Sequence, residues 1–295
     1  MITWGFPVCI DLWLAGMAAG AYLAAFLAER FGKHTDHRLL HTALYIGIPS
    51  AMVGVIFLLA DLSHPLRFWH LFVSVNFTSP MSVGSWLLVL WTTISMLIVV
   101  LWHMRNRIPI KQVILKRIMN YLYTAGFFVS VLLMSYTGVL LAASNQPLWA
   151  STVLLPPLFV TSAISTGAAV LIFVGMVTRM WKIYGETFRR MVQVVAVVIV
   201  IELVVLLVYF FWLFRSGIPG AYESMRQLIT GELAAPFWLG VVLLAILLPF
   251  GLYIANWGKR VGEHRLVVAS SIASSACVIL GGLVLRAVIV FGGQI

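Results

Sequence analysis

The sequence predicts an all-α integral membrane protein with eight transmembrane helices. Hydrophobic residues make up 62% of the 295 residues, and charged residues only 9%. Soluble domains are roughly 45–50% apolar and about 25% charged, so a soluble protein of this length could not bury so much apolar surface. The apolar residues form continuous runs rather than alternating with polar ones, and this pattern predicts membrane-spanning helices rather than strands.

Eight apolar runs are long enough to cross the hydrocarbon core at about 1.5 Å per residue. Met1 is followed by six residues before the first run, without the positive segment of a cleavable signal, so we expect this run to be a true helix. We expect two four-helix bundles, residues 1–145 and 146–295. The runs cover residues 8–29, 42–62, 82–103, 119–143, 153–178, 191–214, 236–256 and 266–290.

The basic residues orient the bundle. The formal charge of +10 would suit a nucleic-acid partner, but 15 of the 19 basic residues lie in the loops after the first, third, fifth and seventh runs. The positive-inside rule places such loops in the cytoplasm. We therefore expect a multi-pass protein of the inner (cytoplasmic) membrane, with both termini on the outer, periplasmic side, and no nucleic-acid partner. Only Arg67, Arg215, Arg226 and Arg286 lie elsewhere.

Small residues recur in two runs that cross the membrane in the same direction. They are WLAGMAAGAY (13–22) and FVTSAISTGAAV (159–170), which suggest a faint internal repeat. Gly16 and Gly20 form a G-x-x-x-G face, which permits close approach of a second helix. We interpret this face as structural.

Four charged residues lie in or beside apolar runs, where charges are costly and usually face a bundle interior. Asp11 and Asp61 lie near the outer ends of the first two runs, and Tyr136 lies about seven residues, roughly 10 Å, below the outer boundary of the fourth. The outer half of the first four helices could thus gather two carboxylates and a phenol. Glu202 lies near the middle of the sixth run, and Arg286 near the outer end of the eighth.

Such a set suits a quinone, which needs hydrogen-bond partners, a proton route and an apolar slot for its tail. Tyr136 could donate to a carbonyl oxygen, and Asp61 or Asp11 could pass protons. Alternatives remain open, because Asp61 could pair with Arg67 or cap a turn, and Asp11 could be an interface residue. Glu202 could be a proton relay or a partner in a buried hydrogen bond. Arg286 is expected to extend to the membrane surface or to pair with a carboxylate.

No histidine or cysteine indicates a metal centre. The seven histidines lie in loops or near the ends of runs, whereas haem ligation in a membrane cytochrome needs histidines facing each other across helices. Cys9 and Cys277 lie in separate apolar runs and are interpreted as packing residues. We therefore expect no haem or metal on this polypeptide and electrons that arrive from a partner.

Several stretches, in order along nearly the whole sequence, resemble the polysulfide-reductase membrane-subunit (NrfD/PsrC) family. LLADLSHPLRFWHLF and FTSPMSVGSW resemble its second-to-third helix signature, and SYTGVLLAASNQPLWASTVLLPPLFVTSAISTG resembles its fourth-to-fifth helix block. Later positions of the family are resembled by three further features of this sequence, which are Glu202 in IEL, the stretch FWLGVVLLAILLP and the stretch GGLVLRAVIVFGGQ. Family members often carry Asn or His near the start of helix one, where this sequence has Trp4, Asp11 and Trp13.

The resemblance implies a haem-free subunit that exchanges electrons between menaquinone or ubiquinone and an iron–sulfur subunit with four [4Fe–4S] clusters. That partner would in turn serve a molybdenum or tungsten bis-pterin enzyme, which would hold the catalytic metal centre and set the terminal substrate. Tyr136 resembles a quinone-contacting residue, and the signature that carries Asp61, His64 and Arg67 would supply the remaining contacts.

Two other functions remain possible on the residues alone. Glu202 could be the carrier of a proton-coupled transporter module, although no pair of Gly/Pro-broken short helices is evident. The protein could also be a passive membrane anchor for catalytic subunits. Residues 64–81 and 215–235 are longer outer connections, and either could dock a partner or lie at the headgroups.

Overall fold

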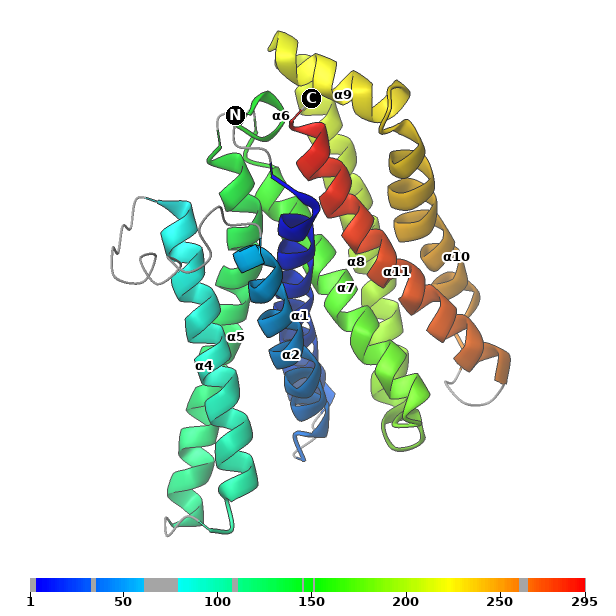
Figure 1. Ribbon diagram of the computed structural model, residues 1–295. Helices are drawn as coiled ribbons and strands as arrows, with labels where there is room; N and C mark the ends of the chain where they lie inside the picture. The colour runs from blue at the N-terminus through cyan, green and yellow to red at the C-terminus, as the bar shows by residue number, and fades with distance from the viewer. Residues whose placement is uncertain are drawn as a thin grey trace.

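The computed structural model consists of helices that cross back and forth between two ends of one bundle (Figure 1). It describes residues 4–32, 36–60, 79–107, 111–144, 146–150, 152–259 and 265–294. The helices are α1 (Phe6–Gly32), α2 (Arg38–Ala60), α4 (Pro80–Met104), α5 (Gln112–Ala142), α6 (Pro147–Ala150), α7 (Leu155–Val177), α8 (Trp181–Arg215), α9 (Pro219–Thr230), the π-helix η2 (Pro236–Leu247), α10 (Leu248–Ala255) and α11 (Arg265–Gly292).

Eight helical segments of the described residues are long and apolar enough to cross a membrane, with η2 and α10 together forming one of them. The eight predicted spans and the all-α fold are therefore confirmed. Some boundaries differ: α5 begins at Gln112 rather than at 119, and α8 at Trp181 rather than at 191. Hydropathy marks only the apolar part of a helix, and the helix continues beyond it because its backbone hydrogen bonds are internal.

One end of the bundle, which we call the terminal end, holds both ends of the described polypeptide (Figure 1). The Trp4 amide donates to Gln294 Oε1 at 2.7 Å, and Gln294 Nε2 donates to the Trp4 carbonyl at 3.0 Å. The short helices α6 and α9 lie at the same end. At the opposite end, which we call the basic end, α1, α4, α7 and α10 finish, and the connections there, together with the adjoining parts of the helices, carry most of the basic residues.

The amphipathic segment predicted over 215–235 contains α9. Ala221 and Leu228 face inward and are fully buried, whereas Glu223 and Arg226 are exposed. The Leu228 side chain packs against Gly292 of α11. This short helix therefore packs on the terminal end of the bundle and turns a charged face outward.

Helix α1 lies at the centre of the bundle. It is the most buried of the spanning helices, because 83% of the residues in its most apolar 18-residue stretch are buried. It packs against α2, α5, α7 and α11. Because α1 contacts helices of both predicted halves, it joins them. The division of the sequence into units 1–145 and 146–295 stays a prediction.

Small residues bring α1 and α7 into backbone contact. A Cβ at Gly20 would overlap the carbonyl of Ala163, and a Cβ at Gly167 would overlap the backbone of Gly20 and Ala21. The two small-residue stretches noted in the sequence therefore pack against each other. Gly20 has the structural role expected of its G-x-x-x-G face, since only glycine permits so close an approach.

The outside of the bundle is apolar. Ile56, Phe128, Leu207 and Phe211 have 63%, 61%, 59% and 63% of their surface exposed. Soluble proteins rarely expose so many large apolar side chains. A lipid environment explains this exterior, because hydrocarbon solvates these side chains and leaves the polar ones to face inward.

Candidate functional site

A pocket of about 390 Å³ lies among α1, α2, α4 and α5 at the terminal end of the bundle. Its lining begins near the start of α1 and α4 and near the end of α2 and α5, with residues such as Val8, Leu59, Met81 and Leu140. All four helices therefore line the pocket mainly with residues from their terminal-end halves. We call this cavity the terminal-end pocket.

The walls of the terminal-end pocket are mostly aliphatic, with Asp11 and Tyr136 among its few polar groups. Ser85, Thr92 and Thr137 also line it, but their hydroxyls donate to carbonyls of their own helices, at 2.9, 2.8 and 2.7 Å. These three hydroxyls are therefore already satisfied by the backbone. The polar groups left to meet a bound molecule are the Asp11 carboxyl, the Tyr136 phenol and the Thr93 hydroxyl.

Asp11 and Tyr136 come from different helices, α1 and α5, and both line the pocket. Asp11 is 9% exposed, and its Oδ1 is buried without a hydrogen bond to any part of the protein that the structure describes. A buried, unpaired carboxyl oxygen is costly, so this atom is suited to a polar group of a ligand. Tyr136 lies six residues before α5 ends at Ala142, about 9 Å, close to the position that the sequence suggested.

Two glycines make room for these polar side chains. A Cβ at Gly54 of α2 would lie 2.8 Å from Asp11 Oδ1, and a Cβ at Gly84 of α4 would overlap the ring of Tyr136. Sequence reasoning missed both residues as members of the site. Gly84 lies in the FTSPMSVGSW stretch, which was the available signal.

The pocket opens sideways between α2 and α4. Its lining residues Met52, Ile56, Met81 and Val89 are 50%, 63%, 41% and 41% exposed on the outside of the bundle. In a bilayer this opening faces hydrocarbon, so an apolar molecule could enter from the membrane without crossing water.

The remaining predicted site residues, Asp61, His64 and Arg67, lie outside the described residues. Asp61 directly follows Ala60, the last residue of α2, and Leu59 lines the pocket. Trp4 and Trp13 have other partners: Trp4 packs on Trp149 with ring centroids 5.6 Å apart, and Trp13 Nε1 donates to the Ile279 carbonyl at 3.1 Å.

A second set of buried polar groups joins α7, α8 and α11. Glu202 is 4% exposed and accepts a hydrogen bond from Ser165 at 2.9 Å, with Ser162 also within hydrogen-bonding reach. Arg286 Nη1 donates to Ser162 Oγ at 3.3 Å. Ser162 therefore lies between the buried guanidinium and the buried carboxyl.

Arg286 does not extend to the membrane surface. Its side chain is fully buried, and Nε donates to the Leu12 carbonyl at 3.2 Å while Nη1 donates to the Gly282 carbonyl at 2.9 Å. The guanidinium also lies over the ring of Phe159, 5.4 Å from its centroid. The expectation that it reaches the surface is wrong, because these carbonyls and the ring solvate the charge inside the bundle.

The described histidines and cysteines form no metal centre. No group of three or more His, Cys, Asp or Glu side chains that could hold a metal occurs within the described ranges. Cys9 is buried in α1, and Cys277 is partly buried in α11. His41 is buried at the start of α2, where its ring stacks on Trp102 with centroids 4.3 Å apart.

These features define a multi-pass helical membrane protein with a lipid-facing pocket that contains a carboxyl and a phenol. The family described as "Polysulphide reductase, NrfD" matches residues 1–295, and the chain belongs to that family. It is 30% identical to Protein NrfD of Escherichia coli (strain K12), over 100% of this sequence and 96% of that protein.

Two further relatives are components of reductases. The sequence is 27% identical to a chain of the polysulfide reductase of Wolinella succinogenes, over 99% of this sequence and 95% of that protein. It is 24% identical to a subunit of the selenate reductase of Mesobacillus selenatarsenatis, over 88% and 68%. The sequence-based assignment to the NrfD/PsrC family is therefore confirmed.

Proposed function

We propose that this protein is the membrane subunit of a respiratory oxidoreductase complex, and that it exchanges electrons between membrane quinone or quinol and an iron–sulfur partner. The observation that carries the proposal is the terminal-end pocket, where Asp11 and Tyr136 line a cavity with mostly apolar walls. Two relatives named as parts of a polysulfide reductase and a selenate reductase support the oxidoreductase class.

The pocket has the chemistry that a quinone ring requires. Its volume of about 390 Å³ lies within the roughly 300–1,000 Å³ of small-molecule sites. Aliphatic side chains of α2 and α4 would hold the ring and the start of the tail, and the sideways opening would admit the tail from the bilayer. Gly84 lets the Tyr136 ring lie deep in the wall, so the phenol hydroxyl would be presented to the ligand.

Tyr136 and Asp11 would divide the proton chemistry. The Tyr136 hydroxyl would donate to one carbonyl oxygen of the quinone and fix its orientation. Asp11 Oδ1, which is buried and unpaired, would accept a proton from a quinol hydroxyl when electrons leave for the partner, or return it in the opposite direction. Asp61, next in the sequence after α2, would continue the route, and His64 and Arg67 would complete the contacts.

Glu202 would serve as a proton relay in the second half of the bundle. Its carboxyl, Ser162, Ser165 and Arg286 form a polar set inside an otherwise apolar region. Arg286 also bonds the carbonyl of Leu12, the residue after Asp11. A change of charge at Asp11 would therefore be felt by the guanidinium, and a shift in this network would move a proton to or from Glu202.

The partners would bind at the terminal end. The basic end would face the cytoplasm by the positive-inside rule, so the terminal-end pocket would lie on the periplasmic side of the inner membrane. An iron–sulfur subunit with four [4Fe–4S] clusters would dock over this end, and a molybdenum or tungsten bis-pterin subunit would lie beyond it. The charged outer face of α9 is available for such a contact.

The test is Tyr136→Phe in the intact complex, which removes one hydroxyl and keeps the ring. Quinol-linked turnover should fall by about 10²-fold, with subunit assembly unchanged. Tyr121→Phe is the matched control, because Tyr121 lies on the same helix and is 68% exposed outside the pocket. Equal turnover in the Tyr136 variant and wild type would overturn the proposal. A purified complex that retains no quinone would favour a passive anchor, and proton uptake without a redox partner would favour a transporter module.

A further inference from the structure

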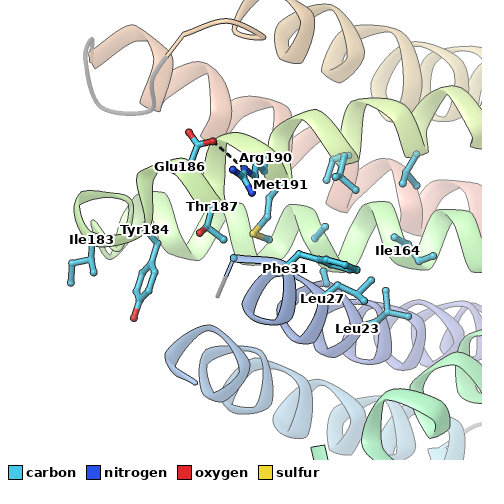
Figure 2. A pocket seen from close by; sticks show the side chains of 17 residues that line it. Leu23, Leu27, Phe31, Ile164, Ile183, Tyr184, Glu186, Thr187, Arg190 and Met191 are labelled. Atoms are coloured by element: carbon cyan, nitrogen blue, oxygen red, sulfur yellow. Dashed lines mark hydrogen bonds and ion pairs between the residues drawn. The ribbon is translucent and has the colours of Figure 1, made fainter. Parts of the chain in front are cut away.

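A second cleft of about 500 Å³ lies at the basic end, between α1, α7 and α8 (Figure 2). It shares no lining residue with the terminal-end pocket. Leu23 and Leu27 of α1 form one wall and Ile164 of α7 lies beside them, opposite Met191 and Val194 of α8. We call this cavity the basic-end cleft, and its inner part is apolar.

The basic-end cleft changes character along α8. Tyr184, Glu186, Thr187 and Arg190 line its outer part, and Met191, Val194, Val195 and Val198 line its inner part. The apolar run that begins at 191 marks the start of the hydrocarbon region. The inner part therefore extends about 10 Å into the membrane at about 1.5 Å per residue, which is within one leaflet of a core about 30 Å thick.

The cleft is accessible from the lipid side. Val194, in the inner part, is 57% exposed on the outside of the bundle, and Phe31 and Ile183, at the outer part, are 74% and 66% exposed. Since the inner walls are aliphatic and open to hydrocarbon, the molecule that fills them should be an apolar chain rather than water.

Glu186 and Arg190 line the outer part of the cleft, and Arg189, which lies outside the lining, shares the Glu186 carboxylate, so this group of three carries a net positive charge. Arg189 binds Glu186 through two nitrogens at 2.8 and 2.7 Å. Arg190 Nε donates to the same carboxylate at 3.0 Å (Figure 2). Two guanidiniums thus share one carboxylate. The Nη groups of Arg190, which is exposed, donate to no group in the residues that the structure describes, so they can bind another anion.

We propose that the basic-end cleft binds an anionic phospholipid. One acyl chain would lie between α1 and α8 against Leu23, Leu27 and Val194. The headgroup phosphate would bind Arg190 at the polar boundary, where a guanidinium can form two hydrogen bonds to phosphate oxygens. An apolar slot beside a cationic rim suits a molecule that carries both an apolar chain and an anionic headgroup.

The first test compares headgroup selectivity in the full-length protein reconstituted in nanodiscs. Native mass spectrometry would count bound phosphatidylglycerol against phosphatidylcholine of the same acyl length. Arg190→Gln should weaken phosphatidylglycerol binding about fivefold, the ratio that one Arg near an anionic headgroup contributes, and leave phosphatidylcholine unchanged. Arg117→Gln is the charge-matched control, because α5 contributes nothing to the cleft.

The second test gives an effect of opposite sign. Glu186→Gln removes the negative charge at the rim, so phosphatidylglycerol binding should become about fivefold tighter. A merely damaged fold would not bind more lipid. Val194→Trp should fill the slot and abolish binding of either lipid, whereas Val197→Trp, on the same helix but outside the lining, should not.

Three results would overturn the proposal. The first is equal retention of phosphatidylglycerol and phosphatidylcholine by the wild type. The second is unchanged binding in both Arg190→Gln and Val194→Trp. The third is recovery of quinone instead of phospholipid, lost with Val194→Trp, which would make the cleft a second quinone site. None of these results depends on the role proposed for the terminal-end pocket.

Discussion

The ring of Tyr136 lies directly against Gly84, so close that even the Cβ of an alanine would overlap it. The phenol on α5 is therefore positioned by the absence of a side chain on α4. This pair connects a packing requirement to the proposed quinone chemistry, and it can be tested without altering either the phenol or the carboxyl.

Gly84→Ala should displace the Tyr136 ring and reduce both retained quinone and quinol turnover, by on the order of tenfold. Overpacking of this kind costs typically 1–3 kcal/mol, and 1.4 kcal/mol corresponds to about a tenfold change. Quinone extracted from the purified complex gives the measurement. Gly251→Ala is the control, since a Cβ there would meet nothing within 4 Å. Equal losses in both variants would show that the ring position is irrelevant.

Asp11→Asn should slow quinol turnover by about 10²-fold and leave quinone binding largely intact. The amide has the same shape as the carboxyl but cannot take up the proton. Steady-state turnover and quinone retention should be measured on the same preparation. Parallel loss of both quantities would mean that Asp11 has a packing role, and normal turnover would remove it from the site.

Glu202→Gln should separate proton movement from quinol chemistry. The variant keeps a side chain that Ser165 can bond, so the fold should be retained. If Glu202 relays protons, proteoliposomes should lose proton translocation coupled to turnover, while quinol oxidation at the terminal-end pocket continues. Full translocation in this variant would reduce Glu202 to a buried hydrogen-bond partner.

Arg286→Lys should destabilise the protein, although it conserves the charge. The guanidinium bonds the Leu12 and Gly282 carbonyls and Ser162 from fixed positions, and an ammonium cannot reproduce that geometry. We expect a loss of about 3–5 kcal/mol, visible as a lower thermal unfolding temperature in detergent. Arg215→Lys, at the exposed end of α8, should unfold at the temperature of the wild type.

Gly20→Ala should weaken the contact between α1 and α7. The added methyl would overlap the Ala163 carbonyl, and neither backbone can move without disturbing the packing of Gly167 on the same contact. The cost should be about 1–3 kcal/mol, measured by thermal unfolding in detergent. An unfolding temperature equal to that of Gly251→Ala would mean that the two helices can separate freely.

The sequence was sufficient for the helical spans because lipid imposes length and composition directly. It also grouped Asp11 with Tyr136, since both lie near the same ends of their helices. It could not show that Gly54 and Gly84 make room for them, because a glycine in a helix has no chemical signature of its own. The interior position of Arg286 was missed for a related reason: its solvating carbonyl, at Leu12, lies 274 residues away.

The bonds between Trp4 and Gln294 have a consequence for biogenesis. The central helix α1 is synthesised before α7 and α11, so its contacts with both helices are complete only after α11 has been made. During translation α1 must therefore stay in the bilayer or beside the insertion machinery with its glycine face uncovered until α7 arrives. A nascent polypeptide that ends before residue 265 lacks α11, so the Leu12 carbonyl and the Trp13 indole of α1 have not yet met their partners Arg286 and Ile279.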